Sequence, residues 1–177
     1  MEQLEQRFKE MLGQIALDEQ GHLTLMGTRS VITPAGSLLG IMEASNDILG
    51  ERGTWIIMYR AGYDTALAFS RAMIEIHGMD PNEVALAYSD FARLRGWGFC
   101  KLMGLDFSDG HGRIHVHGSV FADHFREKGG SQRPVCGFIA GALAGITHAV
   151  SDLPVRAKEV QCAAMGAEYC EIVVQPF

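Results

Sequence analysis

The chain has 177 residues, of which 47% are apolar and 20% are charged, and its formal net charge is −6. This composition is typical of a globular protein and excludes a disordered chain. The length predicts a single domain over residues 1–177. Dense runs of Lys or Arg are absent from the sequence. We therefore expect neither nucleic acid nor an anionic membrane as a partner.

The ends of the chain and its cysteines bear on the cellular compartment. The N-terminus, MEQLEQRFKEML, carries charge from its second residue and does not resemble a secretory signal. The longest apolar stretch, 136–150, is shorter than the roughly 20 residues that a membrane span requires. We therefore expect a cytoplasmic protein without a membrane span. Its four cysteines should stay reduced there unless a metal holds them.

Hydrophobic periodicity predicts the elements of the first half of the chain. Within residues 1–20, Leu4, Phe8, Leu12 and Ile15 recur at helical spacing, which predicts an N-terminal helix. The alternation after His22 predicts a strand pair that turns at Gly27. The remaining predictions are a helix from Pro34 to near Gly50, a short apolar strand at 55–59 (WIIMY) and a helix over 65–77.

The second half opens with a strong helix start. Asp80 is a good N-cap, Pro81 suits the first turn, and Glu83 stands at the third position, so a helix should run to about Arg95. Strands are then predicted at 97–106 and 113–120, followed by helices at 121–127 and 133–150 and by strands at 156–163 and 169–175. Gly166 lies in the last turn, where a positive φ is expected. This order predicts an α+β fold with an antiparallel sheet covered by helices.

The segment KEVQCAAMGAEYCEIVV near the C-terminus concentrates metal-binding side chains. A hairpin around Gly166 can bring Cys162 and Cys170 together, with Glu159 three residues before the first of them. Cys136 lies at the start of the preceding helix, where the helix dipole lowers the pKa of a thiol. Three thiolates and a carboxylate suffice for a closed tetrahedral zinc site, which would be structural. From the spacing alone, ordinary buried thiols are an equally open reading.

The segments GFIAGALAGI and LPVRAKEVQCAAMGAEYCEIVV resemble the signature of the 4-vinyl reductase domain family. That family includes the effector-sensing domains of bacterial activators of phenol and xylene breakdown, and a small protein of bacteriochlorophyll synthesis. The resemblance implies a fold similar to that of TRAPP trafficking subunits and haem-containing nitric-oxide sensors. In the phenol-sensing members a zinc is held by a Cys, a Glu and two further Cys. The matching positions within 133–177 are Cys136, Glu159, Cys162 and Cys170.

The resemblance also implies a pocket between the sheet and the helices. In the phenol-sensing members a Trp and a Tyr line it, and these positions correspond to Val116 and Ala157. Neither is aromatic, which predicts a roomier pocket and a bulkier apolar ligand such as a tetrapyrrole. The other candidate lining residues are aromatic or polar groups on apolar segments. They are Tyr59, Tyr63, His77, Tyr88, Phe91 and Trp97.

Three histidines, His111, His115 and His117, could form a second metal or haem site, or could lie on a solvated strand face. A glycine-rich dinucleotide motif between a strand and a helix is missing from the sequence, so nicotinamide binding is unsupported. These observations favour a non-enzymatic sensor or carrier for a hydrophobic small molecule. By resemblance we expect a homodimer that signals to a protein partner. An enzyme or accessory factor of tetrapyrrole synthesis and a protein-assembly scaffold remain the alternatives.

Overall fold

The computed structural model describes residues 2–25, 28–106 and 109–177. The chain divides into two compact units, Met1–Ser37 and Leu38–Phe177. Every residue of the sites described below belongs to the second unit. Among the described residues, no helix combines the length and the apolar character that crossing a membrane requires.

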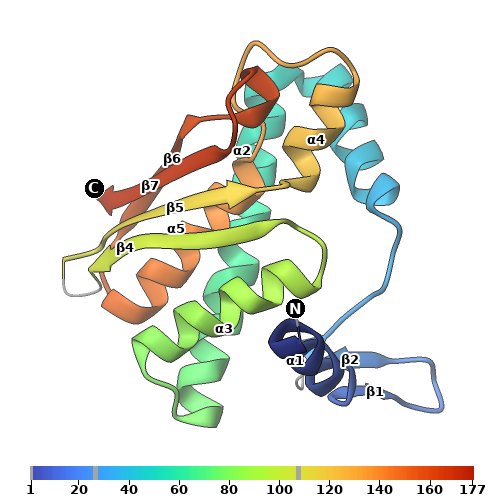
Figure 1. The fold of residues 1–177 in the computed structure, drawn as a ribbon, viewed down its shortest axis with the longest axis vertical. Helices are drawn as coiled ribbons and strands as arrows, with labels where there is room; N and C mark the ends of the chain where they lie inside the picture. Colours follow the sequence, from blue (N-terminus) through green and yellow to red (C-terminus); the bar gives the residue numbers. More distant parts are fainter. Residues whose placement is uncertain (1, 26–27, 107–108) are drawn as a thin grey trace. The chain divides into compact units, whose positions relative to one another are not determined.

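The first unit contains a helix and a small antiparallel sheet (Figure 1). Its elements are α1 (Glu2–Leu12), β1 (Ile15–Leu17), β2 (Leu23–Leu25) and β3 (Thr28–Arg29). The predicted strand pair is present as β2 and β3, whereas the predicted turn at Gly27 lies outside the described residues. The N-terminal helix is shorter than predicted. It ends before Gly13, a residue type that favours helix ends, and the chain then enters β1.

The second unit is built on a four-stranded antiparallel sheet in the order β4-β5-β7-β6. The strands are β4 (Phe99–Asp106), β5 (His111–His117), β6 (Val155–Gln161) and β7 (Cys170–Pro176). Alternate residues of β5 and β7 are buried, with Ile114 opposite Ile172 and Val116 opposite Cys170. One face of the sheet is therefore apolar and must be covered.

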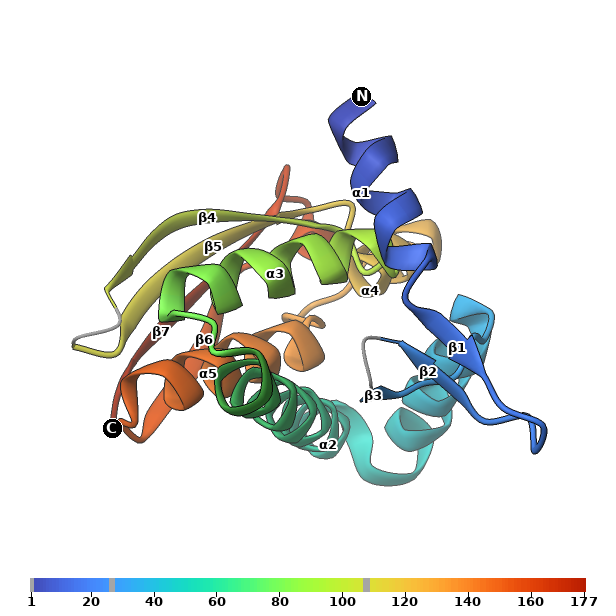
Figure 2. The same cartoon turned by 90° about the horizontal axis from the view of Figure 1, so that it is seen from below.

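Helices cover that apolar face. They are α2 (Ala35–His77), α3 (Pro81–Leu94), α4 (Val120–Glu127) and α5 (Gly137–Ser151). Figure 2 shows α3 and α5 beneath the sheet and α2 beyond them. The predicted capping box of α3 is confirmed: Asp80 accepts hydrogen bonds from the N–H groups of Asn82 and Glu83, and Glu83 accepts one from the N–H of Asp80. The predicted α+β class is confirmed by this architecture.

The strand predicted at 55–59 is wrong, because these residues lie inside α2. The helix is interrupted only at Gly50, whose φ of 70° and ψ of 171° are not helical, so the predicted end near this residue is a break between two helical segments. Beyond the break, buried residues recur at helical spacing as Thr54, Met58, Gly62 and Ala66. Burial of this stripe, rather than the β propensity of WIIMY, decides the local structure.

Two glycines allow α2 and α5 to pack closely. A Cβ on Gly62 would lie 2.0 Å from the carbonyl oxygen of Phe138, and one on Gly141 would lie 1.9 Å from that of Tyr59. Both distances are far below van der Waals contact, so only glycine fits at either position. This packing fixes α5 against α2 and thereby positions the α5 side chains that face the sheet.

Candidate metal centre and ligand cavity

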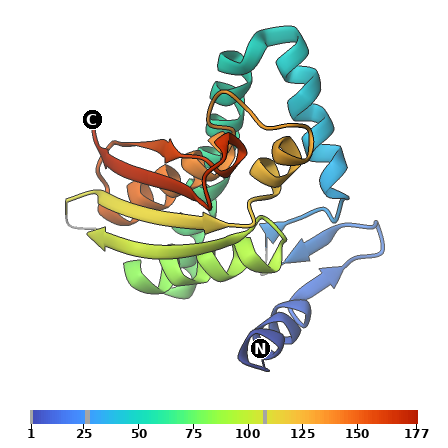
Figure 3. The same ribbon diagram turned by 45° about the horizontal axis from the view of Figure 1, so that its top comes forward.

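Four buried side chains converge where α5 begins and the β6–β7 hairpin turns. Cys136 is the N-cap of α5, Glu159 lies on β6, Cys162 follows β6, and Cys170 begins β7. The hairpin turn contains a short 3-10 helix, Ala163–Met165, and Gly166 has the predicted positive φ, at 97°. Figure 3 shows this turn beside α4 and the loop that leads to α5. The fold thus joins three elements that are separated in the sequence.

The ligand atoms of these four residues all lie within 4.8 Å of one another. The Sγ atoms of Cys136 and Cys170 are 3.5 Å apart, and all four cysteines of the chain are free thiols. Two thiolates on a tetrahedral zinc ion lie about 3.8 Å apart, given a Zn–S distance of about 2.3 Å. Small side-chain movements would therefore close the set around one ion. Among the described residues this is the only group of side chains placed to hold a metal.

Hydrogen bonds orient the cluster but leave one carboxylate oxygen without a partner. The N–H of Cys136 donates to Oε2 of Glu159 at 2.8 Å, and the N–H of Ala163 donates to Sγ of Cys170 at 3.2 Å. Oε1 of Glu159 is buried and has no hydrogen-bond partner. A buried carboxylate oxygen without a partner is costly, and a cation would satisfy it. The residues present therefore fit a metal ion.

The electrostatics of the cluster favour the same conclusion. Burial, together with the neighbouring Cys162, raises the pKa of Glu159 to about 8. Hydrogen bonds with Cys162 and Cys170, together with burial, raise the pKa of Cys136. Only the Cys162 thiol has its pKa lowered, first because Cys136 and Cys170 hydrogen-bond to it. Without a cation the four groups thus resist carrying more than one negative charge, and a divalent ion would allow the others to ionise.

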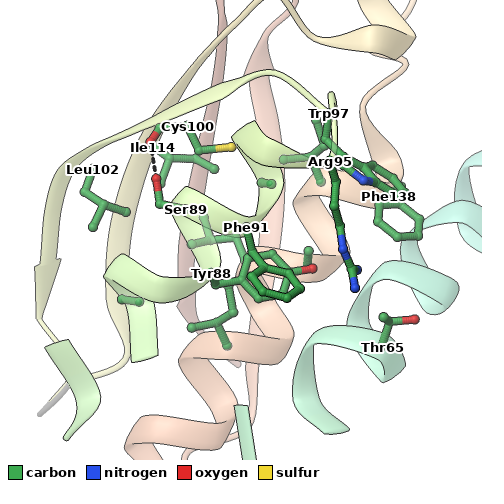
Figure 4. A pocket seen from close by; sticks show the side chains of 16 residues that line it. Thr65, Tyr88, Ser89, Phe91, Arg95, Trp97, Cys100, Leu102, Ile114 and Phe138 are labelled. Atoms are coloured by element: carbon green, nitrogen blue, oxygen red, sulfur yellow. Dashed lines mark hydrogen bonds between the residues drawn. The ribbon is translucent and has the colours of Figure 1, made fainter. Parts of the chain in front are cut away.

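A separate apolar cavity lies between the sheet, α3 and α5. Its volume is about 80 Å³, and it opens partly to solvent. Sixteen residues line it (Figure 4), and ten of them are Thr65, Tyr88, Ser89, Phe91, Arg95, Trp97, Cys100, Leu102, Ile114 and Phe138. The other six are Ala85, Ala92, Ile139, Ala142, Leu143 and Ile146.

The few polar groups of the cavity have distinct environments. Ser89 donates its hydroxyl hydrogen bond to the carbonyl of Cys100 at 2.6 Å. Burial raises the pKa of the Tyr88 hydroxyl and raises that of the Cys100 thiol to about 12, so both are neutral near pH 7. The Arg95 guanidinium lies 4.5 Å from the centre of the Phe91 ring. Arg95 is therefore the cationic group of the lining.

Comparison with known proteins connects this geometry to a family. The family model of the vinyl-4-reductase (4VR) domain matches residues 116–176. The resemblance inferred from the sequence is confirmed. The matched segment is about a third of the chain and contains all four residues of the cysteine–glutamate cluster. A search of the curated proteins found no match.

Solved structures related to this domain share the fold. The phenol-responsive sensory domain of the transcription activator PoxR, solved with phenol, superposes with a TM-score of 0.83 at 18% identity, over 98% of this chain and 90% of that one. A vinyl-4-reductase family protein from Methanocaldococcus jannaschii gives a TM-score of 0.56 at 18% identity, over 84% of each chain.

A trafficking protein particle complex subunit 3 from Naegleria fowleri, covalently bound to palmitic acid, gives a TM-score of 0.53 at 15% identity, over 81% of this chain and 90% of that one. The predicted likeness of the fold to trafficking subunits is thus confirmed. At these identities the comparisons establish the fold alone.

The structure distributes the predicted pocket residues over several environments. Tyr88, Phe91 and Trp97 line the cavity. The Tyr59 hydroxyl instead accepts a hydrogen bond from the N–H of Ala157 at 3.0 Å, and the Tyr63 hydroxyl contacts Nδ1 of His148. Three further predicted residues lie elsewhere: Val116 and Ala157 are buried in the sheet core and His77 is exposed at the end of α2.

The three histidines singled out in the sequence lie on or beside β5 without converging. Nε2 of His115 lies 3.1 Å from Glu171, and its ring stacks on Tyr169 with 4.2 Å between centroids. His117 packs near the same tyrosine, and His111 pairs with Asp109. In the part of the chain that the structure describes, these histidines do not form a metal-binding group.

Proposed function

We propose that this protein is a small-molecule-binding sensor or carrier whose ligand occupies the cavity between β4, β5, α3 and α5. The observation that carries the proposal is the cavity itself, because a domain of this size ordinarily fills its core. The phenol-responsive sensory domain of PoxR, solved with phenol, has the same fold and supports this assignment. A scaffold without a ligand would be expected to have a filled core instead.

The size of the cavity favours a single ring. Its volume of about 80 Å³ is roughly half of the about 150 Å³ of a known apolar protein cavity that holds benzene. The opening to solvent leaves room for a short substituent outside the enclosed space. A tetrapyrrole, which carries four pyrrole rings, would need a large expansion of the site. We therefore propose a monocyclic ligand in place of the bulkier one that the sequence suggested.

We further propose that Cys136, Glu159, Cys162 and Cys170 hold a structural zinc ion. Bound zinc would supply positive charge to the buried carboxylate and thiolates and would cross-link the start of α5 to the β6–β7 hairpin. The partnerless Oε1 of Glu159 and the mutual distance of the four ligand atoms support this assignment. With four protein ligands the site would have no open position for a substrate, so its role would be to stabilise the fold.

We propose that a second copy of the chain is a partner. The outer surface of α2 exposes several large apolar side chains, among them Ile41, Ile48 and Ile56, which are between 55% and 80% exposed. Exposed apolar side chains clustered along one helix mark an association surface. Light scattering coupled to gel filtration should give the mass of a dimer for the wild type and of a monomer for the Ile48→Glu/Ile56→Glu variant. A wild-type monomer would contradict the proposal.

Titration calorimetry with phenol as the probe tests the ligand-binding function. Ala142 is 3% exposed and lines the cavity, so Ala142→Leu should fill the cavity and abolish binding. Ala68 is exposed on α2, and Ala68→Leu makes the same chemical change away from the cavity. We expect binding to the wild type and to Ala68→Leu only. Equal binding to all three proteins would remove the cavity from the account, and binding of a free-base porphyrin to the wild type would contradict the monocyclic ligand.

A further inference from the structure

The charge of the cavity lining is one-sided. Among its 16 residues, Arg95 carries a positive charge and none is an Asp or a Glu. The chain as a whole has a net charge of −6, so a cationic lining runs against the overall composition. Figure 4 shows the Arg95 side chain extending past the Phe91 and Phe138 rings toward Thr65. Because Arg95 and Thr65 are both exposed, this polar side of the lining lies at the opening of the cavity.

The Arg95 guanidinium has aromatic neighbours but no carboxylate partner among the described residues. It packs over the Phe91 ring at 4.5 Å. Burial lowers its pKa, an effect opposed in part by the Tyr88 hydroxyl. The arginines that do form ion pairs in the described part of the chain are Arg60, Arg113, Arg126 and Arg133. Arg95 thus places a partly desolvated and uncompensated cation beside an apolar cavity.

Helix capping does not account for this placement. A cation near the C-terminus of a helix is stabilised by the helix dipole. Arg93, in the last turn of α3, already provides one, and its guanidinium packs over Phe99 at 4.6 Å. Arg93 does not line the cavity, whereas Arg95 does. The two residues share a helix end and an aromatic contact, and they differ in their access to the ligand.

Resting on the proposed ligand-binding function, we infer that the preferred ligand is a small aromatic carboxylate whose anionic group pairs with Arg95. The planar guanidinium presents parallel N–H donors that match the two oxygens of a carboxylate. The apolar lining between Phe91, Cys100 and Leu143 takes the ring, and the size of the cavity restricts the ring to one. Arg95 is in this account the residue that selects an anionic ligand over a neutral one.

Benzoate and benzamide provide a matched pair of probes, because they have nearly the same shape and differ in charge. Calorimetric titrations at pH 7 would compare wild type, Arg95→Gln and, as a control on the same helix end, Arg93→Gln. Charge-assisted hydrogen bonds are stronger than neutral ones. We expect benzoate to bind the wild type and Arg93→Gln about tenfold or more tightly than benzamide, and this preference to be lost in Arg95→Gln. Added salt should weaken benzoate binding and leave benzamide binding nearly unchanged.

The outcomes separate this inference from the function on which it rests. If benzamide and phenol bind the cavity as tightly as benzoate, and Arg95→Gln changes nothing, the ligand-binding function stands and the preference for an anion is overturned. An equal loss of benzoate binding in Arg93→Gln and Arg95→Gln would also overturn it, since the effect would then come from the general charge of the helix end. If no ring compound binds the wild type, both the function and the inference fail.

Discussion

The close packing of α2 against α5 gives a prediction whose magnitude can be worked from distances. In Gly141→Ala, the new Cβ would lie 1.9 Å from the carbonyl oxygen of Tyr59 and 2.9 Å from the backbone nitrogen of Tyr63. Ordinary van der Waals contact begins near 3.4 Å. The two helix backbones would therefore have to separate by about 1.5 Å, because backbone atoms cannot rotate away as a side chain can.

The cost of this separation should exceed what alanine gains as a helix former. Overpacking a core costs about 1–3 kcal/mol and occasionally more, whereas replacing a helical glycine by alanine returns up to about 1 kcal/mol. We expect a net loss of about 2–3 kcal/mol in the free energy of unfolding. For a chain of this length, that corresponds to a fall in Tm of about 5–10 °C.

A second glycine provides the control. Gly40 also lies in α2, but a Cβ there would have no atom within 4 Å. Gly40→Ala should therefore raise the free energy of unfolding by about 0.5–1 kcal/mol. Urea unfolding followed by circular dichroism measures both variants. A Gly141→Ala protein as stable as the wild type, beside a stabilised Gly40→Ala, would refute the close helix contact that positions the cavity wall.

Three further predictions concern the metal centre, the buried thiol and a helix cap. Plasma mass spectrometry should find about one zinc per chain, and acidification should release it because the ligands must be deprotonated to bind; Cys162→Ser should lose the metal and Cys100→Ser should keep it, and equal metal content in both would contradict the site. Cys100 should react slowly with iodoacetamide at pH 8, since burial raises its pKa to about 12 and the thiolate is the reactive form; the raised pKa also means that its contribution to stability is present below pH 9 and is lost as the pH rises toward 12. Labelling of Cys100 as fast in the folded protein as in urea would argue against this burial. Asp80→Ala should cost about 1 kcal/mol in urea unfolding, because the side chain caps α3; an unchanged midpoint would show that the cap contributes nothing.

The sequence predicts features that depend on neighbouring residues. The capping box at Asp80 and the positive φ of Gly166 follow from local chemistry, and both are present in the structure. The cluster of Glu159, Cys162 and Cys170 could be predicted because a hairpin brings nearby positions together. The position of Cys136 beside them depended on family resemblance, since its contact with Glu159 spans 23 residues.

Features that depend on packing between distant elements could not be predicted in this way. The run WIIMY has β propensity, and only its burial against α5 makes it helical. The cavity combines α3, β4, β5 and α5, so Arg95 and the residues of α5 carried no local signal of their role. Tyr59 illustrates the opposite error: its hydroxyl is used by the N–H of Ala157 at the edge strand β6 rather than by a ligand.

Tryptophan fluorescence tests most directly whether a small ring occupies the cavity. The chain has two tryptophans, and Trp97 lines the cavity while Trp55 stacks on Tyr59 outside it. In Trp55→Phe, the remaining Trp97 should report a saturable change in emission as phenol or benzoate is added. In Trp97→Phe, the remaining Trp55 should report none. Saturable signals of equal size in both variants, or no signal in Trp55→Phe, would contradict the proposal that this cavity is the binding site.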